Sequence, residues 1–66
     1  MELKINGKPF QVEENSHIDQ LLKQLELNPH QVIIELNRNI LKKETFADTR
    51  LSQGDTLEII QFVGGG

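Results

Sequence analysis

A single amphipathic segment, residues 18–25, limits what this chain can fold into. Its apolar residues recur at the i, i+3, i+4 and i+7 spacing of one helix face: Ile18, Leu21, Leu22 and Leu25. Ser16 is placed to cap the first turn, and Asn28-Pro29 is expected to end the helix because proline disfavours helical geometry in the residue before it. Since the apolar face must be buried, the sequence predicts a two-layer α+β domain with this helix packed on one face of a mixed sheet.

Residues 1–12 are predicted to form a β-hairpin. Apolar and polar residues alternate on both sides of Asn6-Gly7, the dipeptide that best accepts the positive φ angles of a type I′ turn. A two-residue loop places Leu3 opposite Phe10, so the apolar side chains share one face. Pro9 has no backbone N–H to donate, which indicates that the second strand lies at an edge of the sheet.

Three more strands are predicted after the helix, at residues 32–36, 40–41 and 56–63, where β-branched and alternating apolar residues gather. A turn at 37–39 joins the first two. Phe46 and Leu51 are expected to anchor the irregular segment 42–53 in the core. The predicted order is therefore β-β-α-β-β-β. The chain is predicted to form a single domain, residues 1–66, that ends in a flexible glycine tail at 64–66.

Size and composition exclude several classes of protein. A chain of 66 residues buries only about 60 % of its unfolded surface, and without cysteine no disulfide can stabilise it. The net charge of −3 argues against nucleic-acid binding, which normally requires a basic face. No apolar run approaches the roughly 20 residues of a membrane span, and no signal peptide is evident. We therefore expect a soluble, cytoplasmic protein that binds neither nucleic acid nor membrane.

No group of side chains indicates catalysis or a metal centre. His17 and His30 have no second ligand at metal spacing, and the carboxylates are scattered singly, without a pair for acid–base work. Lys42-Lys43, with Arg38 and Arg50 nearby, form a local basic region that is either solvated or docks on an acidic partner. We expect no bound metal, no cofactor held by this chain and no enzymatic activity.

The last strand leads from an apolar surface into a glycine run. If Leu57 and Ile59 face the helix, the next residues along the strand alternate onto the opposite face of the sheet. The predicted partner-binding patch consists of Ile33, Ile60, Phe62 and Val63, unless a loop covers part of it. The tail that follows is Gly64, Gly65 and Gly66. Without side chains it can enter a narrow channel on a partner and present a terminal carboxylate there.

Together these features resemble the ubiquitin-like β-grasp proteins and, within them, the ThiS family of sulfur carriers in thiamine biosynthesis. The residues that carry the resemblance are Ile5-Asn6-Gly7, residues 36–41 before Phe46, Gly54-Asp55, and the run from Phe62 to Gly66. Lys42 departs from the family, whose members often carry a proline there. The resemblance covers the whole chain.

The resemblance implies a carrier, not a catalyst. In such proteins an E1-like activating enzyme uses ATP and Mg to adenylate the terminal glycine carboxylate, here Gly66. Sulfur from a cysteine desulfurase system then displaces AMP to give a thiocarboxylate, and a thiazole synthase accepts the sulfur. The alternatives are the small subunit of molybdopterin synthase, a ubiquitin-like protein modifier, and a plain interaction module whose terminal glycines are an artefact.

Overall fold

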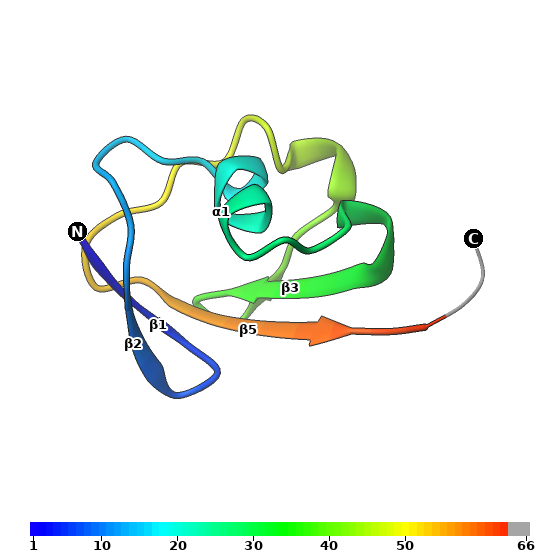
Figure 1. The fold of residues 1–66 in the computed structure, drawn as a ribbon, viewed down its shortest axis with the longest axis horizontal. Coiled ribbons are helices and arrows are strands. Elements are labelled where there is room, and N and C mark those ends of the chain that lie inside the picture. Colours follow the sequence, from blue (N-terminus) through cyan, green and yellow to red (C-terminus); the bar gives the residue numbers. More distant parts are fainter. Residues whose placement is uncertain (64–66) are drawn as a thin grey trace.

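The computed structural model describes residues 1–63, and its elements follow the predicted order β-β-α-β-β-β (Figure 1). They are β1 (Glu2–Ile5), β2 (Lys8–Gln11), α1 (Ile18–Gln24), β3 (Val32–Leu36), β4 (Asn39–Ile40) and β5 (Thr56–Gln61). Two short 3₁₀ turns, η1 (Pro29–Gln31) and η2 (Lys43–Thr45), lie between them. The predicted glycine tail, residues 64–66, lies outside the described residues.

The strands form one mixed sheet, in the order β2-β1-β5-β3-β4. β1 and β5 are parallel and every other neighbouring pair is antiparallel, so β5 lies at the centre of the sheet. β2 is an edge strand, as Pro9 predicted. Met1 and Val12 exchange two main-chain hydrogen bonds, of 2.7 and 2.9 Å, and Leu3 pairs with Phe10. This alternation turns the nitrogen of Pro9 away from β1, where no hydrogen bond is needed.

Both hairpins turn through two residues in the left-handed region. Asn6 and Gly7 have φ angles of 51° and 83°, which confirms the predicted type I′ turn. In the β3–β4 hairpin the same role falls to Asn37 and Arg38, with φ angles of 49° and 73°. Asparagine tolerates this region, whereas arginine gives no local signal for it. A tight turn after β3 is therefore confirmed, but it spans 37–38, so β4 begins at Asn39, one residue earlier than predicted. β5 likewise ends at Gln61, before the predicted end at 63.

Helix α1 covers one face of the sheet, and the segment between β4 and β5 folds around it (Figure 1). Together they enclose a core of buried apolar side chains: Leu3, Val12, Ile18, Leu21, Leu22, Val32, Ile34, Phe46, Leu51, Leu57 and Ile59. Phe46 and Leu51 belong to this core, which confirms them as anchors of the irregular segment. Among residues 1–63, no helix combines the length and apolar character that crossing a bilayer requires.

The helix begins one residue later than Ser16 predicted. Its N-cap is His17, whose N–H donates to Oε1 of Gln20 at 2.7 Å. The Ser16 hydroxyl instead donates to the Glu13 carbonyl at 2.7 Å and closes the preceding turn. The prediction was wrong because a serine can bond to the chain on either side of it, and the choice depends on where the loop enters the helix.

The helix also ends earlier than predicted, at Gln24 and not at Asn28-Pro29. Leu27 N–H donates to the Leu22 carbonyl at 2.9 Å, and Glu26 N–H donates to the Lys23 carbonyl at 3.1 Å. These two bonds form a Schellman motif, in which Glu26 takes a φ of 59° at the position that glycine usually occupies. Pro29 instead begins η1, so its restriction acts after the chain has already left the helix.

Candidate functional site

Strand β5 has the predicted phase. Leu57 and Ile59 are 0% and 8% exposed beneath the helix, whereas Ile60 is 59% exposed on the opposite face. Ile60 pairs with Ile33 of β3, which is itself 46% exposed. Two isoleucines on neighbouring central strands therefore lie side by side on a face of the sheet that the helix does not cover.

The exposed apolar surface continues along β5. Phe62 and Val63 are also exposed, and the Phe62 N–H still donates to the Gln31 carbonyl at 2.9 Å, which keeps Phe62 in register beside β3. All members of the predicted patch are thus accessible, and no loop covers Ile60. We call Ile33, Ile60, Phe62 and Val63 the outer patch.

Ile40 is a further exposed apolar residue on this face, which the sequence did not assign to the outer patch. It is 69% exposed and pairs with Glu35, and Glu35 shares the outer face of β3 with Ile33. The two-residue turn that follows β3 determines which way Ile40 points. Recognising that turn in the sequence would have placed Ile40 beside the patch.

Two carboxylates border the outer patch. Glu35 and Glu58 are direct partners on β3 and β5, one step along the same face from the pair of Ile33 and Ile60. Within residues 1–63 neither glutamate forms an ion pair. Like charges placed directly opposite destabilise a sheet, so this arrangement costs the free chain stability. The outer face therefore combines apolar side chains with two carboxylates that form no ion pair.

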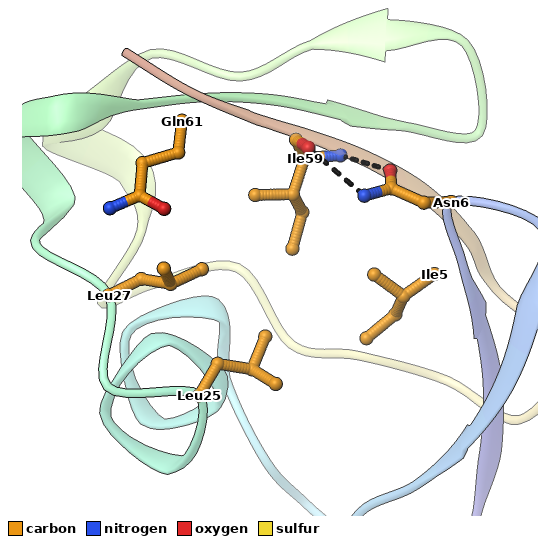
Figure 2. Close-up of a pocket in the computed structure, with 6 residues that line it drawn as sticks. All are labelled: Ile5, Asn6, Leu25, Leu27, Ile59 and Gln61. Atoms are coloured by element: carbon orange, nitrogen blue, oxygen red, sulfur yellow. Dashed lines mark hydrogen bonds between the residues drawn. The ribbon is translucent and has the colours of Figure 1, made fainter. Parts of the chain in front are cut away.

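A groove opens on the other face of β5, between the sheet and the C-terminal end of the helix (Figure 2). Its volume is about 300 Å³, and its lining residues are Ile5, Asn6, Leu25, Leu27, Ile59 and Gln61. Leu25 and Leu27 reach it because the helix ends early and the Schellman motif turns the chain back towards the sheet. No charged side chain is among the lining residues. No local sequence pattern predicts this groove, because it depends on where the helix stops.

The basic and histidine residues do not assemble into a site. Arg38 lies in the β3–β4 turn, whereas Arg50 forms an isolated bridge with His17 at the start of α1. Lys43 Nζ lies 3.0 Å from His30 Nδ1. In the described part of the chain no group of His, Cys, Asp or Glu has the arrangement that could hold a metal ion.

Comparisons with known proteins agree with this architecture. The sequence pattern of the ThiS family matches residues 3–66. A crystal structure of the thiamine biosynthesis protein ThiS from Geobacter metallireducens matches with a TM-score of 0.85 and 38% identity, and covers 100% of both chains. The sulfur carrier protein ThiS of Bacillus subtilis is 37% identical over 97% of this chain and 98% of that protein. A thiazole synthase of Paramagnetospirillum magneticum is 35% identical over 100% of this chain, which spans 20% of that protein. The chain therefore belongs to the ThiS family and has its ubiquitin-like β-grasp fold.

Proposed function

We propose that this protein is a sulfur carrier for thiazole formation in thiamine biosynthesis. The carboxylate of Gly66 is adenylated by an activating enzyme, which uses ATP and Mg and releases pyrophosphate. Persulfide sulfur from a cysteine desulfurase system then attacks the acyl adenylate and displaces AMP, and a thiol reductant cleaves the resulting acyl disulfide to leave a thiocarboxylate, which a thiazole synthase accepts. The observation that carries this proposal is the course of β5, which passes from an exposed apolar face directly towards Gly64-Gly65-Gly66 in a chain of the ThiS family.

The division of chemistry between this chain and its partner follows from the properties of a carboxylate. A carboxylate is a poor electrophile until one oxygen becomes part of a leaving group, which adenylation achieves. The partner supplies ATP and the catalytic groups, and this chain supplies the reacting carboxylate and a surface that positions it. Holding the tail in place then raises the effective concentration of the reacting group. On this proposal the chain itself is not an enzyme.

The outer patch is proposed as the docking surface for these partners. Its isoleucines are exposed and adjacent, which suits the apolar centre of an interface. Glu35 and Glu58 suit a cationic side chain at its border, since a partner charge there would relieve their repulsion. The match of this chain to part of a thiazole synthase supports the thiamine pathway over molybdopterin synthesis or protein modification.

Removal of Gly65 and Gly66 tests the proposal. The shortened chain should melt as the full chain does, because these residues have no side chains to bury, yet it should not support ATP–pyrophosphate exchange by the activating enzyme. Lys23→Ala, on the exposed side of α1, is the matched control and should support normal exchange. Exchange by the shortened chain would refute the carrier function.

Thiocarboxylate formation separates the thiamine pathway from its rivals. After incubation with the activating enzyme and a sulfur source, the intact mass should rise by the difference between sulfur and oxygen, and a thiazole synthase should reverse that rise. Transfer of the activated chain to protein lysines would instead identify a modifier. If only a large subunit of molybdopterin synthase reverses the mass increase, the chain is a sulfur carrier for molybdopterin synthesis.

A further inference from the structure

The main-chain groups of β5 point alternately towards its two neighbours. The Asn37 N–H donates to the Thr56 carbonyl at 2.8 Å, and the Phe62 N–H donates to the Gln31 carbonyl at 2.9 Å. These bonds, with the antiparallel register, direct the even-numbered residues of β5 towards β3. The N–H and C=O groups of Leu57, Ile59 and Gln61 therefore face the side where β1 lies.

β1 pairs with only the first part of that side. Its last strand residue, Ile5, is level with Leu57, and the Asn6 N–H donates to the Leu57 carbonyl at 2.9 Å. The chain then turns away into β2. At the next position the Asn6 side chain takes the place of a strand, as Figure 2 shows: Oδ1 accepts from the Ile59 N–H at 2.8 Å and Nδ2 donates to the Ile59 carbonyl at 3.1 Å.

The Asn6 side chain does not reach Gln61, the next residue of β5 that faces this side. Gln61 presents its N–H and C=O on the same side as Ile59, and within residues 1–63 no group forms a hydrogen bond with either. Gln61 as a whole residue is exposed. Beside its main-chain groups lies the groove, whose other walls include Ile5, Leu25 and Leu27. An open main-chain donor and acceptor thus border an uncharged, mainly apolar groove.

We propose that this edge of β5 pairs with an extended segment of the activating enzyme. This inference rests on the proposed function, because it names how the enzyme holds the base of the tail. The segment would supply one main-chain acceptor and one donor to Gln61 and place an uncharged, apolar side chain in the groove. Such strand addition to an exposed sheet edge is a general mode of peptide recognition.

The chemistry and position of this site both favour that occupant. A helix cannot supply both a main-chain donor and a main-chain acceptor to Gln61, because its interior groups are bonded to one another and each end offers only donors or only acceptors. A volume of about 300 Å³ is at the lower limit for a small-molecule pocket but accommodates a side chain. β5 carries the outer patch on its opposite face and continues towards Gly66, at most about 18 Å of extended chain beyond Gln61. An enzyme that acts on Gly66 while it contacts the outer patch therefore has this edge within reach.

Amide hydrogen exchange followed by NMR gives the direct test. In the free chain the amides of Ile59 and Phe62 should exchange slowly, because both donate hydrogen bonds, and that of Gln61 should exchange fast. Saturation with the activating enzyme should slow Gln61 to the level of its neighbours. Fast exchange of Gln61 in the saturated complex would overturn the proposal. Slow exchange that appears at high concentration of the chain alone, together with a dimer, would also overturn it, since the occupant would be a second copy.

Gln61→Pro provides the functional test. Proline removes the N–H that faces the groove and leaves the hydrogen bonds to β3 in place. The half-saturating concentration of the chain in ATP–pyrophosphate exchange should rise about tenfold, as the loss of one hydrogen bond and a tight contact predicts. Gln11→Pro is the matched control. By the register of the β1–β2 hairpin its N–H also has no strand partner, but it lies on the outer edge of β2 beside the start of β1, away from Gln61, so exchange should be unchanged.

These outcomes separate the inference from the proposed function. If the parent chain supports no exchange, the proposed function fails. If the parent is active and Gln61→Pro matches Gln11→Pro, only the edge pairing is refuted. If Gln61→Pro does not fold, as thermal melting would show, the amide exchange of the parent chain decides the question by itself.

Discussion

Replacing Ile60 by lysine is expected to leave the fold intact. With 59% of this side chain exposed, folding buries less than half of it. Full burial of isoleucine contributes about 1.5–3 kcal/mol, so the substitution should cost about 1 kcal/mol. Lysine should also stabilise this face through attraction to two carboxylates. Glu35 lies diagonally across on β3, and Glu58 lies two residues earlier on β5. Glutamate at the same position would add a third carboxylate and should be the less stable variant.

Binding to the activating enzyme should respond much more strongly than folding. An apolar contact at Ile60 would bury the part of the side chain that is still exposed, which corresponds to about 1–2 kcal/mol, and a charge left without a partner in the interface adds to that loss. Since about 1.4 kcal/mol is a factor of ten, Kd should rise at least about tenfold for both variants. Thermal melting and titration calorimetry on one sample measure both effects.

Ile34→Lys is the matched control for the fold, because Ile34 lies on the same sheet but is 0% exposed. It should unfold the protein, since a buried lysine has no partner there. If Ile60→Lys unfolds it equally, the outer face is not an open surface. If Ile60→Lys binds as tightly as the parent, the enzyme contacts some other part of the molecule. If only Ile60→Glu loses binding, charge and not apolar contact determines recognition.

Two further predictions concern stability. Leu22→Ala removes a side chain that is 1% exposed and should cost about 2–5 kcal/mol, a large part of the total for so small a domain, so an unchanged urea midpoint would contradict its place in the core. Glu26→Gly should instead stabilise by about 1 kcal/mol and raise Tm by about 4–8 °C, because a residue with a Cβ is strained at a φ of 59°. Glu26→Gln, which removes only the charge at the helix C-terminus, should give a smaller gain, and a lower Tm for Glu26→Gly would refute the strain.

The helix ends show where local sequence signals were insufficient. Ser16 and Pro29 are both acceptable helix boundaries by their chemistry, yet neither is used. The observed stop places Glu26, a residue with no preference for positive φ, in the left-handed region. Packing of Leu25 and Leu27 against the core accompanies this turn. Cap preferences amount to about 1 kcal/mol, so tertiary packing can override them.

The sequence by itself determined the features that depend on neighbours a few residues away. Asn6-Gly7 set the first hairpin and its register, and the two-residue alternation of β5 placed Ile60 on the outer face and Leu57 in the core. Both follow from turn geometry and from the period of a strand, which are local properties. The order of elements and the outer patch could therefore be predicted.

Only the tertiary structure decided what distant segments build together. The Asn6 side chain completes the edge of β5 at Ile59, 53 residues away, and leaves the main-chain groups of Gln61 open beside the groove. The pairing of Glu35 with Glu58, which gives the outer face its charge, likewise depends on the register between β3 and β5. No pattern within either segment encodes these contacts, because each arises from long-range pairing whose register is chosen by burial of the shared core.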